Sequence, residues 1–304
     1  MEFFKANTKI PFMKQRKAAA IFSAVIIVAS LLSLAIFRLN LGLDFTGGTQ
    51  VEVSFTQAAN ANQLRDNLKK AGFKEAVVQA YGARDFSVRI APHKNESQDQ
   101  VHAELIAALP GATVGQLDYI GPQVGQELMT NGILAIIVSL LGTMIYVALR
   151  FDWRFAIGAG VALIHDPLLI LGVFSLFHLE FNLIVLAAVL TVIGYSLNDT
   201  IVVYDRVREN FRKMRKAEPR EIMDASINQT LSRTIMTSGL TLLVVIALLL
   251  FGGPTLQPFA LALMIGIIIG TYSSIYVAGS LAISIGLDHS TLSSNTKPID
   301  DGMP

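Results

Sequence analysis

The sequence predicts an α-helical polytopic membrane protein with six transmembrane helices and one α+β, ferredoxin-like extracytoplasmic domain. The 304-residue chain is 52% hydrophobic and 15% charged, with a mean hydropathy of +0.53, whereas soluble domains carry about 25% charged residues. Six apolar segments have the length that spans a bilayer, about 20 residues. A single stretch of ordinary soluble composition, between the first and second segments, shows mixed strand and helix patterns. These three observations together define the class.

The six apolar segments begin after a basic N-terminus at 1–17. The first, 18–37, is interpreted as an uncleaved helix, because it is too long for a signal-peptide core and no small-x-small cleavage site follows it. The other five fall within 131–286, before a polar tail at 287–304. They lie at 132–149, 155–177, 182–204, 234–251 and 259–286.

Lysine and arginine are segregated among the short connections. They occur in the N-terminus, at Arg150 and Arg154, and in a basic connection at about 205–233, whereas 178–182 and 252–258 contain none. The positive-inside rule therefore places both termini in the cytoplasm and the domain at 38–130 outside it. Topology and anionic lipid account for the basic connection, so no nucleic-acid partner is expected.

The stretch at 38–130 has the pattern of a small α+β domain. Residues 49–55 alternate with a period of two, as a half-buried strand does, and Asn60 and Gly72 delimit a helix as cap and stop. The order strand-helix-strand-strand-helix-strand is that of a split βαβ, ferredoxin-like fold. Residues 121–131, which contain Gly and Pro, are a candidate hinge. The expected elements are 49–55, 60–72, 75–82, 85–91, 96–111 and 112–121.

The fourth apolar segment contains the consecutive polar residues Asn198, Asp199 and Thr200. Successive helical residues point about 100° apart, so protein or water must surround this part of the helix. At about 1.5 Å per residue, Asp199 lies roughly 25 Å from the outer edge, and Arg233 on the next segment lies about 27 Å in. Structural hydrogen bonding with a snorkelling arginine and a functional acid–base pair both remain open.

A second polar pair, His165 and Asp166, lies about 15 Å into the third segment. Pro167 follows and frees the carbonyl four residues earlier. A packed polar cluster that joins helices and a proton relay are both compatible with this pattern. Small residues, among them Gly266 and Gly270, permit close helix contacts.

The motifs of several enzyme classes are absent from the sequence. It contains no cysteine, no zinc-protease or serine-hydrolase motif and no phosphate-binding loop. Tyr204-Asp205 matches one element of intramembrane aspartyl proteases, but the Gly-x-Gly-Asp element is missing. We therefore expect no catalytic residue, no metal and no cofactor.

Three stretches resemble the SecF family, the smaller subunits of SecDF protein-export complexes, which are similar to half of a resistance-nodulation-division transporter. They are LGLDFTGGTQVEV at 41–53, YSLNDTIVVYDRVREN at 195–210 and TLSRTIMTSG at 230–239. The resemblance covers nearly the whole chain. Pro167 departs from the family pattern, in which an aliphatic residue is expected.

The resemblance implies an inner-membrane protein of bacteria, a non-enzymatic component with its domain in the periplasm, that uses the proton-motive force to promote protein export. It implies SecD as the heterodimer partner, together with Sec channel subunits, exported unfolded preproteins, protons and membrane lipids. A pure scaffold for SecD and a related proton-driven efflux half-transporter are the alternatives. The implied proton-pathway residues are Asp199 and Arg233, supported by Asn198 and Thr200, and the junction after the first helix carries Asp44, Gly47 and Gly48.

Overall fold

The computed structural model describes residues 9–288 except 74–75, 81 and 91–97, and the chain divides into two compact units. The helical unit comprises the chain up to Asn40, Ala135–Leu179 and the chain from Ile184. The α/β unit comprises Leu41–Leu134 together with Glu180–Leu183. The sequence predicted a domain in one continuous stretch, so the contribution of Glu180–Leu183 is an addition that the sequence did not indicate.

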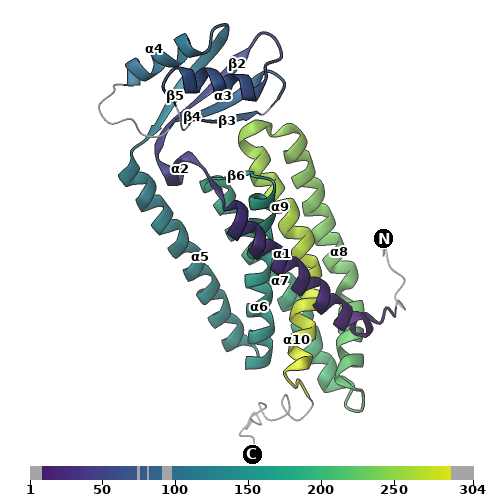
Figure 1. Cartoon of the computed structure of the whole chain (residues 1–304). Coiled ribbons are helices and arrows are strands. Elements are labelled where there is room, and N and C mark those ends of the chain that lie inside the picture. The colour runs from purple at the N-terminus through teal and green to yellow at the C-terminus, as the bar shows by residue number, and fades with distance from the viewer. Residues whose placement is uncertain (1–8, 74–75, 81, 91–97, 289–304) are drawn as a thin grey trace, which may run out of the picture. The chain divides into compact units, whose positions relative to one another are not determined.

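Among the residues that the structure describes, six helical segments are long and apolar enough to cross a membrane, which confirms the predicted helical membrane class. The last of them is interrupted by the π-helical segment η2 between α9 and α10. Within the described residues the long helices are α1 (Arg16–Phe37), α5 (Pro122–Arg150), α6 (Trp153–Leu176), α7 (Leu183–Lys213), α8 (Pro219–Phe251) and α9 (Gly253–Ser273), followed by η2 (Ser274–Ala278) and α10 (Gly279–Ser284), while η1 (Phe12–Gln15) precedes α1 (Figure 1).

Two segments predicted as connections are largely helical. Helix α7 continues to Lys213 and α8 begins at Pro219, so only 214–218 of the expected basic loop at 205–233 are non-helical. Glu209 pairs with residues three positions before and four positions after it, a spacing that supports a helix. The candidate hinge at 121–131 is also helical, because α5 begins at Pro122, and proline is well suited to the first helical position.

The α/β unit has the predicted order of elements. Its four-stranded sheet has the order β3-β4-β2-β5 with antiparallel neighbours, so β4 lies between β2 and β3 as in a split βαβ arrangement. The predicted residues at 74–75, 81 and 91–97 lie outside the described part. The elements are β2 (Gly48–Phe55), α3 (Ala61–Lys70), β3 (Val77–Ala80), β4 (Asp85–Ile90), α4 (Gln98–Ala108) and β5 (Ala112–Ile120), with α2 (Leu43–Thr46) before them.

Helices α3 and α4 bury their apolar stripes against the sheet. Leu68 on α3 and Leu105 on α4 are fully buried with Val53 and Val88 from the central strands. The side chain of Asn60 accepts a hydrogen bond from the backbone N–H two residues later at 2.9 Å, as the sequence predicted for an N-cap. Alternation along the strands and helical spacing in α3 and α4 therefore place one core between the two layers.

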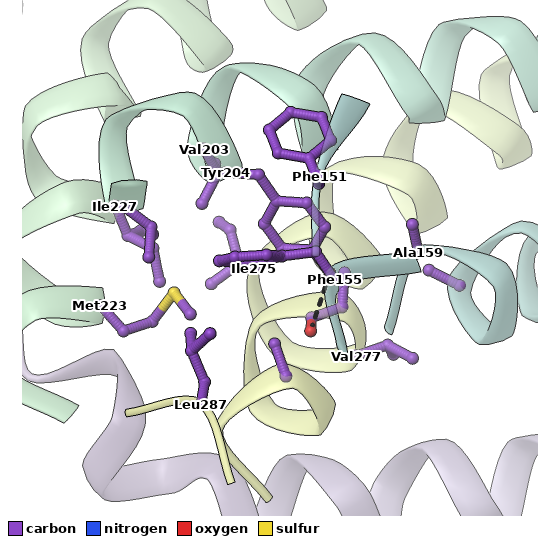
Figure 2. Packing of buried hydrophobic residues seen from close by; sticks show 14 of the residues in the cluster. Phe151, Phe155, Ala159, Val203, Tyr204, Met223, Ile227, Ile275, Val277 and Leu287 are labelled. Carbon is purple, nitrogen blue, oxygen red and sulfur yellow. Dashed lines mark hydrogen bonds between the residues drawn. The ribbon is translucent and has the colours of Figure 1, made fainter. Parts of the chain in front are cut away.

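The core of the helical unit surrounds Tyr204 of α7. Figure 2 shows this ring beside Phe155 of α6, and the two ring centroids are 4.5 Å apart. The Tyr204 hydroxyl donates a hydrogen bond to the Ala278 carbonyl of η2 at 3.1 Å. A Cβ at Gly158 would lie 2.7 Å from both of these oxygen atoms. The absence of a side chain at Gly158 therefore allows α6, α7 and η2 to meet.

Candidate functional site

The junction after the first membrane helix is built by α2 and by the start of α7. The backbone N–H of Gly42 donates to the Phe181 carbonyl at 2.8 Å, within the strand pair β1 (Asn40–Leu41) and β6 (Glu180–Phe181). The backbone N–H of Leu183 donates to Asp44 Oδ2 at 2.8 Å. Asp44 thus supplies a carboxylate to the N-terminus of α7, where an acceptor and a negative charge are both favourable.

Two glycines allow the backbone at this junction to pack closely. Gly47 has φ +65° and ψ 176°, a region that glycine alone adopts readily. A Cβ on Gly47 would lie 2.9 Å from Pro122 Cα, and a Cβ on Gly125 would lie 2.9 Å from the Gly47 nitrogen. The start of α5 therefore rests directly on the backbone that follows α2.

Charged side chains surround the same junction. Arg89 donates from Nη1 to the Leu41 carbonyl. Burial raises the pKa of Glu180, the nearby charge of Arg89 opposes this shift, and the charge of Asp44 adds to it. The carboxyl group of Glu180 is thus held in a place where its charged form is disfavoured.

The raised pKa of Glu180 makes the stability of this junction depend on pH. The protonated form of Glu180 stabilises the folded junction relative to its charged form. This stabilisation is fully present below the ordinary pKa of glutamate, about 4.3, and is lost as the pH rises through the raised pKa. At neutral pH we therefore expect the amide hydrogens of Gly42 and Leu183 to exchange with solvent more slowly in Glu180→Gln than in the wild type. Below about pH 4 both side chains are neutral, and we expect equal protection.

Hydrogen exchange followed by mass spectrometry on the full chain measures this difference at each pH. Glu104→Gln is the matched control, because Glu104 is exposed on α4 and its loss should leave the junction unchanged. Equal protection in the wild type and Glu180→Gln at all pH values would contradict the prediction.

Asp199 lies inside the helical unit and is 4% exposed. Its Oδ2 accepts a hydrogen bond of 3.4 Å from the hydroxyl of Ser238 on α8. The hydroxyl of Thr271 on α9 lies 3.1 Å from that of Ser238. Three helices therefore meet at this carboxyl group through hydroxyl side chains.

The other predicted proton-pathway residues take different positions. The Thr200 hydroxyl is buried and donates to the Ser196 carbonyl at 3.2 Å, while Asn198 and Arg233 are exposed on the surface of this chain. Within the described residues, Arg233 forms no ion pair of 4.0 Å or less with Asp199, but its charge acts electrostatically on that carboxyl group. The structure thus places Asp199 and Arg233 in electrostatic reach without direct pairing.

Asp166 is the centre of a second polar group. It is completely buried, and its Oδ2 accepts from the hydroxyls of Ser196 at 2.5 Å and Ser273 at 2.9 Å. Its Oδ1 lies 2.9 Å from Nδ1 of His165. Adjacent residues of a helix point about 100° apart, but here the imidazole turns back toward the neighbouring carboxylate.

Glycines of α9 bring these groups together. A Cβ on Gly266 would lie 2.2 Å from Val192, and a Cβ on Gly270 would lie 3.1 Å from Ser196, so the predicted small-residue pair packs against α7 of the same chain. Sequence reasoning missed the four hydroxyl residues of the site. Their signal is the small polar residues within apolar helices, which hydrogen-bond across helix contacts: Ser196, Ser238, Thr271 and Ser273.

The fold and these contacts define a multi-pass membrane protein with buried carboxyl groups between its helices and a separate α/β unit. Residues 100–288 match the profile of the protein export membrane protein SecD/SecF C-terminal family, and residues 32–59 match the SecD/SecF GG motif. The latter range contains Asp44, Gly47 and Gly48.

Curated relatives extend this similarity over almost the entire chain. The chain is 51% identical over 292 residues to the protein translocase subunit SecF of Vibrio alginolyticus, covering 94% of this chain and 93% of the relative. It is 44% identical over 283 residues to the protein of the same description from Escherichia coli O157:H7, covering 91% and 88%. The chain therefore belongs to the SecD/SecF family of protein-export membrane proteins.

Solved structures show the same fold. The crystal structure of SecDF, a translocon-associated membrane protein from Thermus thermophilus, is matched with a TM-score of 0.87 at 38% identity, covering 93% of this chain and 39% of that chain. SecDF in the super-membrane-facing form is matched with a TM-score of 0.70. This chain thus spans about two-fifths of the length of the SecDF chain.

Proposed function

We propose that this chain is an accessory subunit of the Sec protein translocase of the bacterial inner membrane. Together with a SecD-type partner, it uses the proton-motive force to promote translocation of unfolded preproteins or their release. The relatives described as protein translocase subunits and the SecDF structure described as translocon-associated support this role. The basic connections support cytoplasmic termini and a periplasmic α/β unit.

The observation that carries the proposal is the buried Asp199 within electrostatic reach of Arg233 but without an ion pair. Coulomb energy varies inversely with separation, so the proton affinity of Asp199 depends on its distance from the guanidinium group. A movement of α7 against α8 that changes this distance couples proton binding to conformation. One charge that crosses about 100 mV provides about 2.3 kcal/mol.

The exposure of the Asn198 and Arg233 side chains favours the presence of a partner subunit in the membrane. Both lie on helices long and apolar enough to span the membrane, and exposure of a charged group to lipid costs free energy, which reaches about 2.5–3.5 kcal/mol at the centre of a span. A second membrane subunit that covers this face removes that cost. The SecDF chain, of which this chain matches 39%, has the additional length for such a partner.

Reconstitution tests the proposed function directly. Vesicles that contain the translocase and the SecD-type partner, with or without this chain, receive an imposed proton gradient while entry of a labelled preprotein is measured. We expect the gradient to accelerate export only when the chain is present. Equal acceleration without the chain would contradict the proposal, and a benefit of the chain that is independent of the gradient would indicate a scaffold.

A further inference from the structure

The segment Thr271–Ser274 of α9 and η2 lies between two buried carboxyl groups. Its first residue contacts Ser238, which hydrogen-bonds Asp199, and its third residue, Ser273, hydrogen-bonds Asp166. On α7, Asp199 follows Ser196, the other hydroxyl donor to Asp166, by three positions. Helices α7 and α9 therefore connect the two acids: Asp166 bonds to both of them directly, whereas Asp199 lies on α7 and reaches α9 through Ser238 of α8.

The charge on Asp166 has a single neutralising partner. Within the part of the chain that the structure describes, Asp166 pairs with His165 and forms no ion pair with lysine or arginine. An isolated charge buried in a protein costs several kcal/mol. Three hydrogen-bond donors satisfy the carboxylate but leave its charge in place, whereas a proton held on the imidazole cancels that charge.

His165 has one ring nitrogen available for that proton. The carboxylate of Asp166 is an acceptor, so Nδ1 of His165 is assigned as the donor. The imidazole is 2% exposed, and its Nε2 makes no hydrogen bond within the described residues. Buried polar nitrogens are nearly always paired, so this nitrogen, which is an acceptor when Nδ1 carries the proton, is available to bind a proton.

The helices beside this pair depart from regular geometry. Pro167 interrupts the backbone hydrogen bonds of α6 directly after Asp166, and the π-helical segment η2 begins directly after Ser273. Prolines in helices remove a backbone hydrogen bond, and short π-helical segments are frequent at functional sites. Two of the backbone segments that hold the cluster thus depart from regular α-helical hydrogen bonding.

We propose that His165 and Asp166 form a second proton-binding site that is coupled to Asp199 through Thr271–Ser274. A proton added at His165 Nε2 changes the net charge of the pair from −1 to 0, and its loss restores the charge. Two titratable groups on neighbouring helices connect to the pair: Tyr272, whose ring centroid is 6.4 Å from that of the imidazole, and Asp199, on which the charge of Arg233 acts. The coupling to Asp199 extends the proposed function and rests on it, whereas proton binding by His165 and Asp166 is independent of that function.

Nuclear magnetic resonance of the full chain, labelled with ¹⁵N in its histidines and placed in lipid nanodiscs with its partner subunit, tests the site. His165→Gln identifies the resonances of His165 by their loss. In the wild type we expect His165 to change from the neutral form protonated at Nδ1 to imidazolium as the pH is lowered. In Asp166→Asn we expect it to remain neutral over the same range, because the carboxylate that stabilises the imidazolium is gone.

A milder variant keeps the test decisive if Asp166→Asn does not assemble. Ser273→Ala removes one hydrogen bond to the carboxylate, so the transition of His165 should persist but occur at a different pH. Ser284→Ala is the matched control, since its hydroxyl donates to the Ser280 carbonyl of its own helix, and it should leave the transition unchanged. A single protonation state of His165 at every pH at which the wild type remains folded would overturn the proposal.

Asp199→Asn separates this inference from the proposed function. Displacement of the His165 transition in this variant supports the coupling, and an unchanged transition overturns it. If His165 titrates while Asp199→Asn exports protein normally, the second site stands and the proposed function fails. If His165 does not titrate while Asp199→Asn loses gradient-driven export, the function stands and the second site fails.

Discussion

Replacement of Asp199 by asparagine is expected to abolish the acceleration of protein export by a proton gradient and to leave gradient-independent export unchanged. Asparagine preserves the shape of the side chain and its ability to accept a hydrogen bond from Ser238, but its amide group binds no proton near neutral pH. One charge through about 100 mV supplies about 2.3 kcal/mol, equivalent to about a 40-fold bias between two conformations. The measurement is the export rate in vesicles with and without the gradient.

Asp205→Asn provides the control for this variant. Asp205 lies on the same helix, but its side chain is 43% exposed and pairs at the surface with Arg150 at 3.1 Å, a contact worth about 0–1 kcal/mol. We expect gradient-driven export close to that of the wild type. Full gradient-driven export in Asp199→Asn, with the subunits still assembled, would contradict the proton role and favour a scaffold.

Replacement of Gly47 by alanine is expected to destabilise the α/β unit by about 2–6 kcal/mol. A backbone conformation that disfavours a side chain costs about 1–3 kcal/mol, and insertion of a methyl group into close packing costs about 1–3 kcal/mol more. The added Cβ would lie 2.9 Å from Pro122 Cα. This is a backbone atom of α5, so a rotamer change cannot relieve the contact. Hydrogen exchange of the β2 and β5 amides in the full chain measures the loss.

Gly111→Ala separates backbone strain from overpacking in that experiment. Gly111 also has a positive φ, +82°, but a Cβ there would meet no atom within 4 Å. We therefore expect only the left-handed backbone cost, about 1–2 kcal/mol. Equal losses in the two variants would show that the contact with Pro122 contributes nothing.

Local sequence signals were sufficient for most elements of the fold. Asn60 caps α3 as its position before an apolar helical stripe predicted, and alternation along 49–55 identified strand β2. The connection expected at 205–233 is helical except for 214–218, and helix α5 begins at Pro122 within the candidate hinge at 121–131. Hydropathy alone does not distinguish such helical turns from irregular connections, and the hinge role of 121–131 stays a prediction.

The candidate site was recognised in part. The sequence drew attention to Asp199 and Asp166 because carboxyl groups are rare in apolar spans. It gave no means to choose Ser238 or Ser273 among the many serines, since a hydroxyl group is tolerated in a helix with or without a partner. It also placed Asp199 and Arg233 at similar depth but left their direct contact open, because depth does not specify separation.

The sequence by itself determined that the chain crosses a membrane six times, that an α/β unit follows the first span and that ionisable groups lie within the spans. Hydropathy, charge distribution and periodicity are properties of neighbouring residues, so they could be read directly from the chain. Only the tertiary structure decided that Asp44 caps α7, that Glu180–Leu183 join the α/β unit and that α9 connects two acids. These contacts join residues far apart in the chain, and their geometry depends on how whole helices pack.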